Sequence, residues 1–334
     1  MRIVLSRFPL LVACASLAAA CSSSNNAMNP PPGATPDLGT AAPAPLSAEI
    51  SIPKIAAGQE MTVCSTVQLK NETDVDIVRL QADLQPGSHH LVLYRSTETV
   101  ESLDPTPCVP FEGIQQGIVP ILIAEIHSTD IQLPKNVAYH FPPHQMVRIE
   151  AHYINVSQAD IVGHGKVAMI QGDSGTTYQA ADLMLMGSIS QLSSQGVPPN
   201  TQSFTLNPGF FSGGTKIDFT KLTFFALTGH EHHLGDTVTV AKSASKTDPG
   251  TMLYESKSWD NAPMLVFDDA HQLTFGAGEG FRWQCSYNSM DAVPKPTTVT
   301  MFGQSAVSNE MCFMWAYYYP SIGRPVTAAD GVFQ

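Results

Sequence analysis

The sequence has few charged residues, and the basic ones are the scarcer kind. Of 334 residues only 14% are charged, and 17 Lys and Arg residues stand against 29 Asp and Glu residues, for a formal net charge of -12. Binding to the phosphates of a nucleic acid needs a cluster of Lys and Arg side chains. The composition therefore argues against nucleic acid as a partner.

Long amphipathic segments are missing too. No extended apolar pattern with a 3.6-residue period follows residue 25, and no repeat of fixed length is visible. Short runs rich in Val, Ile, Thr, Phe and Tyr instead alternate with 25 prolines and 24 glycines. That pattern is typical of many short strands joined by turns, so we expect an all-β protein. The length favours two domains.

The strand-like runs form two series, separated by a Ser-, Gln- and Pro-rich stretch at 188–201 that we expect to be a loop. The first series comprises residues 61–69, 77–84, 90–94, 145–155 and 166–171. The second begins near residue 182 and includes 204–206, 221–227, 236–241, 280–287, 297–302 and 311–319. We predict two tandem antiparallel β-sandwich domains, residues 47–180 and 181–334.

The first 21 residues have the order of a bacterial lipoprotein signal. Two arginines precede an apolar stretch, and three alanines stand directly before Cys21 and Ser22. Cys14 is a rival lipidation site, but it would leave an unusually short apolar region, so we favour Cys21. An ordinary cleaved signal peptide is the alternative and would give a secreted protein. Both kinds of signal predict that the folded protein lies outside the cytoplasm.

Residues 22–46 are rich in Ser, Asn, Pro and Ala and lack apolar periodicity. Such a segment cannot offset its ordering entropy by burial, so we predict a disordered tether. Together with the signal, it predicts an exported protein, lipid-anchored to a bacterial cell-envelope membrane and contacting the membrane only through that anchor.

Four cysteines remain beyond the signal: Cys64, Cys108, Cys285 and Cys312. An even number in an oxidising compartment predicts two disulfides, and four cysteines allow three pairings, among which composition does not choose. A zinc site is poorly supported because the chain has no Cys-x-x-Cys spacing.

The strongest local motif is Gly-His-Glu-His-His-Leu-Gly at 229–235. Residues two apart on a strand share a face, so His230 and His232 can offer their rings to one metal ion, while Glu231 and His233 point the other way. Standing alone, the pair could also be surface or hydrogen-bonded histidines. A role for Glu231 or His233 in supporting the ligands is a further hypothesis.

Weaker signals lie elsewhere in the chain. His89 and His90 are adjacent, so joint metal binding requires a bend or bulge in their strand. His152 lies within an apolar strand, where a single histidine is more often a core residue than a ligand. Met311 has a thioether that suits Cu(I), although most such methionines only fill a core.

In their chain order, His89-His90, His152, His230-x-His232 and Glu310-Met311-Cys312 resemble one known family, the copper type II ascorbate-dependent monooxygenases. This family includes peptidylglycine α-hydroxylating monooxygenase and dopamine β-monooxygenase. The similarity covers roughly residues 48–334. His-x-His-His-Leu-Gly, Cys-x-Tyr-Asn-Ser at 285–289 and Glu-Met-Cys are each uncommon.

The resemblance implies two coppers per chain, reduced by ascorbate and facing each other across a solvent-filled cleft between jelly-roll-like domains. It assigns His89, His90 and His152 to an electron-transfer copper in the first domain. It assigns His230, His232 and Met311 to an oxygen-binding copper in the second, where O2 is used to hydroxylate a C–H bond. It also selects the disulfides Cys64–Cys108 and Cys285–Cys312.

The residues expected to line the substrate pocket differ from those of the peptide-amidating enzyme. The peptide-amidating enzyme has an arginine where this chain has Thr228, a tyrosine where it has Trp315, and a polar residue where it has Phe313. Without the arginine, a terminal carboxylate loses its bidentate partner. We therefore expect a small apolar or aromatic substrate rather than a glycine-extended peptide.

Two other functions fit the same residues. A non-catalytic copper-binding lipoprotein would need the same ligands, and a β-sandwich binding module would carry the histidines incidentally. The remaining histidines match no family ligand and are expected to be exposed or hydrogen-bonded: His127, His140, His144, His164, His233 and His271.

Overall fold

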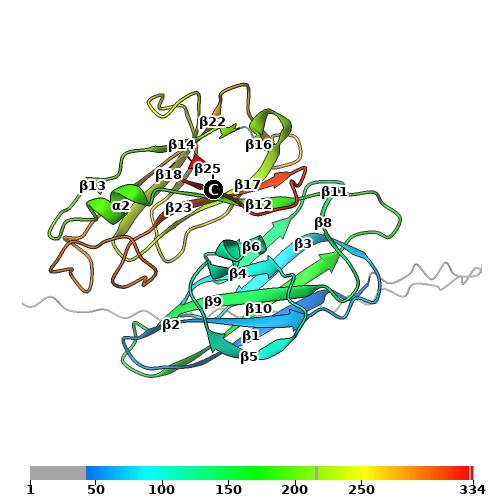
Figure 1. The fold of residues 1–334 in the computed structure, drawn as a ribbon. Coiled ribbons are helices and arrows are strands. Elements are labelled where there is room, and N and C mark those ends of the chain that lie inside the picture. Colours follow the sequence, from blue (N-terminus) through cyan, green and yellow to red (C-terminus); the bar gives the residue numbers. More distant parts are fainter. Residues whose placement is uncertain (1–42, 215–216, 331, 334) are drawn as a thin grey trace, which may run out of the picture. The chain divides into compact units, whose positions relative to one another are not determined.

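The computed structural model describes residues 43–214, 217–330 and 332–333, and its regular structure is almost entirely β (Figure 1). Residues from Pro43 onward form one compact unit. The predicted signal peptide, Cys14, Cys21 and all but the last four residues of the predicted tether lie outside the described residues. Neither described α-helix is long or apolar enough to span a bilayer.

The first half of the unit contains two sheets. Its elements are β1 (Leu46–Ile55), β2 (Glu60–Gln68), β3 (Val75–Leu84), β4 (Ser88–Arg95), β5 (Ser102–Pro107), α1 (Glu112–Gln115), β6 (Val119–Ala124), β7 (Ser128–Gln132), β8 (Val137–Phe141), β9 (Met146–Ile154), β10 (Ile161–Gln171) and β11 (Gln179–Ala180). One sheet has the order β1-β10-β3-β8-β11, with β7 also paired to β3, and the other has the order β5-β2-β9-β4-β6.

The second half is built in the same way. Its elements are β12 (Asp182–Gly187), α2 (Ser190–Ser194), β13 (Phe204–Thr205), β14 (Gly209–Phe211), β15 (Gly213–Gly214), β16 (Ile217–Asp218), η1 (Phe219–Lys221), β17 (Thr223–Glu231), β18 (Gly235–Ser243), β19 (Thr251–Ser256), β20 (Leu265–Val266), β21 (Leu273–Thr274), β22 (Gly280–Tyr287), β23 (Cys312–Tyr319), β24 (Val326–Ala329) and β25 (Val332–Phe333). The main sheets are β20-β17-β23-β12-β24-β25 and β13-β22-β18-β19.

The predicted all-β class is confirmed, with three differences in detail. Residues 297–302 contribute only isolated bridges at Thr300 and Phe302, not the strand that was predicted. Helix α2 lies within the stretch expected to be a loop. The sheets are not wholly antiparallel, because β11 pairs with β8 and β24 with β12 in parallel.

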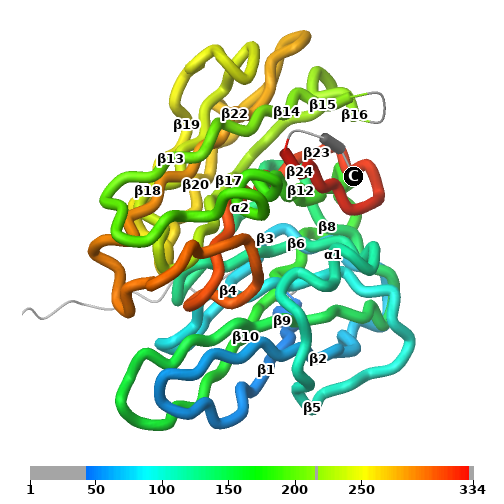
Figure 2. Tube along the Cα trace, turned by 60° about the vertical axis from the view of Figure 1, so that its left-hand side comes forward, coloured from blue at the N-terminus to red at the C-terminus, as the bar shows by residue number. Residues whose placement is uncertain are grey.

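The central strand β23 contributes to both hydrophobic cores, because successive side chains of a strand point to opposite faces. One face carries Phe313, Trp315 and Tyr317. The other carries Cys312, Met314, Ala316 and Tyr318. The first of these cores also contains the interior of the β1–β10 half, so the two halves share it. Figure 2 shows α1 and β6 where the halves meet, and β6 packs against β12.

The switch from one pair of sheets to the other falls between β11 and β12, at residues 180–182. This is close to the predicted domain boundary. The structure from Pro43 onward is nevertheless one compact unit, so the division into two domains stays a prediction.

Candidate metal centre

Three histidines of the first half lie on neighbouring strands. His89 and His90 are on β4, and His152 lies directly opposite His90 on β9. The register of this pair of strands shifts between Ser88 and His90, which is the bulge that two adjacent histidines need if they are to share a face. The rings of His89 and His90 have centroids 5.2 Å apart, and those of His90 and His152 are also 5.2 Å apart.

Two histidines of the second half lie at the end of β17. His230 is in the strand and His232 follows its last residue, with ring centroids 5.2 Å apart. Buried Glu310 accepts hydrogen bonds from the backbone N–H groups of His232 and Leu234. Its carboxylate therefore fixes the turn that carries His232.

The two groups of histidines meet in one buried cluster. The ring centroid of His89 lies 4.8 Å from that of His230 and 5.4 Å from that of His232. All five side chains are at most 2% exposed. The expected solvent-filled cleft between the groups is therefore wrong for this structure, because the core that the two halves share brings the rings into contact.

Several ring nitrogens in this cluster have no hydrogen-bond partner although they are buried. They are both nitrogens of His89, Nδ1 of His90, Nδ1 of His152 and Nε2 of His230. An unpaired buried polar atom is costly, so such atoms in a native protein call for an explanation such as an ion. Two sets made only of histidines have donor atoms within 4.8 Å of one another: His89–His90–His152 and His89–His230–His232. The donor chemistry fits a metal ion that prefers imidazole.

Burial favours the neutral form of four of these imidazoles, those of His89, His90, His230 and His232. Desolvation lowers the pKa of His89, His90 and His232 well below the ordinary value, and it lowers the pKa of His230 to about 3. The neighbouring rings lower these values further by mutual repulsion of their charged forms. A neutral imidazole keeps the lone pair that a metal ligand must offer.

Three buried or half-buried carboxylates contact the outer nitrogens of the rings. His90 Nε2 lies 3.4 Å from Glu150, His152 Nε2 lies 3.1 Å from Glu60, and His230 Nδ1 lies 3.0 Å from Glu125. Ligating histidines commonly donate their second N–H to such acceptors, which fixes the orientation of the ring.

None of these three carboxylates was predicted from the sequence. The available signal was a charged residue at an apolar position, as where Glu125 directly follows the fully buried strand β6. Glu231 and His233, which the analysis did consider, take other positions. Glu231 is buried with Oε1 unpartnered, and His233 Nδ1 lies 3.1 Å from the carbonyl oxygen of Ala306.

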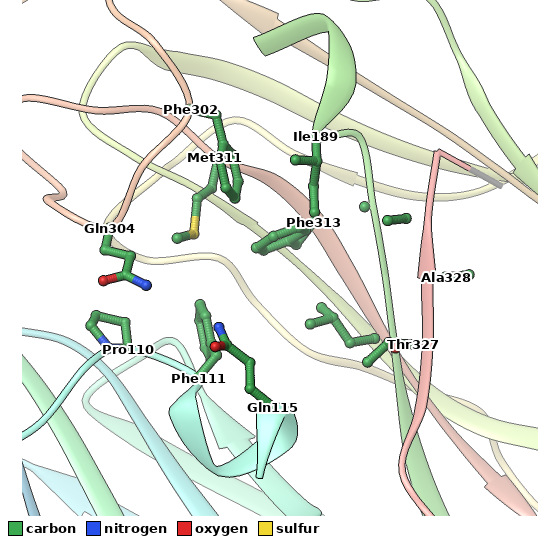
Figure 3. Close-up of a pocket in the computed structure, with 13 residues that line it drawn as sticks. Pro110, Phe111, Gln115, Ile189, Phe302, Gln304, Met311, Phe313, Thr327 and Ala328 are labelled. Atoms are coloured by element: carbon green, nitrogen blue, oxygen red, sulfur yellow. The ribbon is translucent and has the colours of Figure 1, made fainter. Parts of the chain in front are cut away.

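Met311 directly precedes β23. The pairing of β17 with β23 sets His230 opposite Phe313 and Glu231 opposite Cys312. Because side chains alternate along a strand, Met311 belongs to the face that carries Phe313 and His230. Its side chain is 2% exposed and extends into a pocket (Figure 3).

This pocket has a volume of about 190 Å³, and none of the described residues lining it is charged. Its wall comprises Pro110, Phe111, Gln115, Leu185, Gly187, Ile189, Phe302, Gln304, Met311, Phe313, Thr327, Ala328 and Ala329. In Figure 3, the amide groups of Gln115 and Gln304 face a lining that is otherwise mostly apolar.

Of the three residues expected in a substrate pocket, only Phe313 lines this one. Trp315 is fully buried behind it, with its ring 5.4 Å from that of Phe111 and its indole N–H unpartnered. Thr228 is also buried, and its hydroxyl donates to the carbonyl oxygen of Pro263. The reason is geometric: the pocket lies over β23, β12 and β24, whereas Thr228 is on β17.

Both disulfides selected by the family resemblance are present. Cys64 bonds to Cys108 and Cys285 bonds to Cys312, so that prediction is confirmed. Disulfides fit an exported protein. The histidines outside the cluster are exposed or hydrogen-bonded, as expected; His140, for example, contacts Asp76, and His271 contacts Asp268.

The described residues combine an all-β fold, five buried histidines that could hold a metal ion, and two disulfides that fit an exported protein. Residues 179–329 match the family described as copper type II ascorbate-dependent monooxygenase, C-terminal domain. This match to a family that depends on copper and ascorbate confirms the resemblance drawn from the motifs. No curated protein matches the chain.

Proposed function

We propose that the protein is a copper-dependent monooxygenase that uses ascorbate and O2 to hydroxylate a C–H bond of a small apolar or aromatic substrate. One oxygen atom of O2 would enter the substrate and the other would leave as water, with ascorbate supplying two electrons. The observation that carries the proposal is a cluster of five buried histidines with unpartnered nitrogens, combined with a thioether facing an uncharged pocket.

The proposed ligands form two sets, one from each half of the chain. His89, His90 and His152 would hold an electron-transfer copper, and His230, His232 and Met311 would hold the copper where O2 reacts. The unpartnered nitrogens of His90 and His152 are both Nδ1, whereas that of His230 is Nε2. Bound copper would supply the one-electron steps of O2 reduction, and the thioether would favour its reduced form.

The residues of the chain itself would perform three tasks. The neutral imidazoles bind the metal without first losing a proton. The carboxylates of Glu60, Glu125 and Glu150 hold three of the rings in place. Phe111, Phe302 and Phe313 line the pocket beside Met311 and exclude water from the substrate.

The substrate class follows from the charge and size of this pocket. A carboxylate substrate would need an arginine or lysine to offset its desolvation, and the described lining has neither. A small aromatic molecule would bury its ring against the three phenylalanines, while the amides of Gln115 and Gln304 can bind one polar group.

We infer further that residues 47–180 and 181–334 act as two copper domains, tethered outside the cytoplasm by a lipid on Cys21. The two disulfides support export. Mass spectrometry of the membrane-extracted protein would identify the lipid. A Cys21→Ser variant that stays membrane-bound would contradict the anchor.

The proposal is tested by loading the purified protein with copper and measuring ascorbate-driven O2 uptake with a panel of small aromatic compounds. The expected result is two coppers per chain and substrate-dependent O2 uptake with a hydroxylated product. Copper binding with no product from any compound would reduce the function to copper binding. Less than one copper per chain would refute both the monooxygenase and the copper-binding function.

A further inference from the structure

Glu125 is a buried carboxylate at the junction of the two halves. It directly follows β6, whose six residues are all buried, and it is 4% exposed. Within the described part of the chain its carboxylate forms hydrogen bonds only with His230, which lies 105 positions later in the sequence. Both of its oxygens take part, at 3.0 and 3.1 Å from Nδ1.

These contacts define which nitrogen of His230 carries its proton. Two oxygens at nearly equal distances from one nitrogen fit a single N–H shared between two acceptors, so Nδ1 is assigned as the donor and Nε2 holds the lone pair. Nε2 is also the nitrogen that is buried without a partner. The ring is thus held with its free lone pair toward the other histidines of the cluster.

We infer that Glu125 is a positioning residue that fixes the tautomer and orientation of His230, so that the first half of the protein completes the metal site of the second half. The inference rests on the proposed function only in requiring that His230 binds copper.

The surrounding contacts show why Glu125 can do this. Two residues before it, Ile123 donates its backbone N–H to the hydroxyl oxygen of Tyr317 on β23 at 2.9 Å, and the same hydroxyl lies 3.3 Å from the Ile123 carbonyl oxygen. Strand β23 in turn pairs with β17, which carries His230. Strand β23 is therefore hydrogen-bonded both to β6, through Tyr317, and to β17. This arrangement holds Glu125, at the end of β6, next to His230.

Direct ligation by Glu125 is the competing arrangement, since one donor atom each of His90, Glu125 and His230 lies within 4.8 Å of the others. The geometry favours the positioning role. Both carboxylate oxygens lie at hydrogen-bonding distance from Nδ1, and a ligating oxygen would have to leave this contact.

The test compares copper binding by the wild type, Glu125→Gln and Glu125→Leu, each in the full chain. The amide oxygen of Gln can still accept from Nδ1–H, whereas Leu has no acceptor. Removing such a partner typically weakens metal binding about 10- to 100-fold. Glu125→Leu should therefore weaken one of two coppers by that factor in a chelator competition, and Glu125→Gln should weaken it much less. The matched control is Glu49→Gln, an exposed residue of β1 paired with Lys166, which should match the wild type.

A specific readout separates positioning from a general effect on folding. The Cu(II) electron paramagnetic resonance spectrum should change for one copper only, and in a His230→Ala background Glu125→Leu should cause no further loss of copper. Unchanged copper affinity and spectrum in Glu125→Leu would overturn the inference. Equal losses in the Gln and Leu variants would overturn it in favour of direct ligation, and a persisting loss in the His230→Ala background would overturn it in favour of a folding effect.

The proposed function can fail separately. Copper-loaded wild type that oxidises no substrate would refute the monooxygenase while leaving the comparison of copper affinities readable. Wild type that binds no copper would refute both.

Discussion

Cys312 is bonded to Cys285 of the neighbouring sheet and directly follows Met311 in the chain. The bond joins β22 to the start of β23, at the edge of the pocket that Met311 enters. One covalent link therefore fixes the backbone next to the proposed thioether ligand.

Replacing both cysteines, Cys285→Ala with Cys312→Ala, should lower the free energy of unfolding by about 3 to 4 kcal/mol, because the bond closes a loop of 27 residues. It should also weaken one copper site. Urea unfolding and copper titration measure the two effects. The double variant at Cys64 and Cys108 is the control, expected to lose stability but keep the Met311 site. Equal copper loss in both double variants would contradict a specific effect of the Cys285–Cys312 bond on the Met311 site.

The sulfur of Met311 should be necessary for turnover. Met311→Leu keeps the side-chain volume, so it should cost less than about 1.5 kcal/mol of stability but abolish ascorbate-driven hydroxylation. Met314→Leu is a matched control, because Met314 lies three residues further on in β23 but faces the other core. Product formation by Met311→Leu at the wild-type rate would refute the proposed oxygen site.

Copper should stabilise the folded protein. The unpartnered nitrogens exist as a group only when the two halves are folded together, so the metal binds the folded chain more tightly than the unfolded one. At a free copper concentration 100-fold above the dissociation constant, the gain is about 2.7 kcal/mol for one site. Thermal unfolding with copper and with a chelator should differ by several degrees. Identical melting curves would contradict a metal site in the cluster.

Gly187 gives Phe313 its position in the pocket wall. The two residues pair across β12 and β23, and a Cβ on Gly187 would lie 1.9 Å from the Phe313 ring. Gly187→Ala should therefore displace that ring, costing about 1 to 3 kcal/mol and raising the KM for substrate while copper binding stays unchanged. Gly214→Ala, which enters open space, is the control. An unchanged KM would show that substrate binds elsewhere.

Asp182 should make stability depend on pH. Its side chain accepts hydrogen bonds from the N–H groups of Ile322 and Gly323, but burial is the largest effect and raises its pKa above the ordinary 3.8. Between the unfolded and the folded pKa the folded state binds more protons, so this group's contribution to stability falls as pH rises. Asp182→Asn removes that titration. Its stability relative to wild type, from urea unfolding, should increase from pH 3 upward and then level off; a constant difference would contradict this.

Part of the site could be predicted because its signals are local. Adjacent or alternate histidines on a strand share a face under simple rules, and the bulge required at His89 is present. The carboxylates could not be predicted in this way, because Glu125 is 105 residues from His230 and nothing near either residue indicates the other. Residues 297–302 were predicted as a strand on β-branched composition, but they form only isolated bridges, to Val197 and Glu310, because strand formation depends on partners distant in the chain.

The sequence by itself determined the β class, the two groups of histidines and, through its motifs, the resemblance to a copper-dependent family, since these depend on residue type and short spacing. Only the tertiary structure decided that the two groups form one buried cluster, that Glu125 of one half binds His230 of the other, and that Phe313 rather than Thr228 lines the pocket. Those relationships depend on how two sets of sheets pack over a shared core, and packing over such distances leaves no local pattern in the chain.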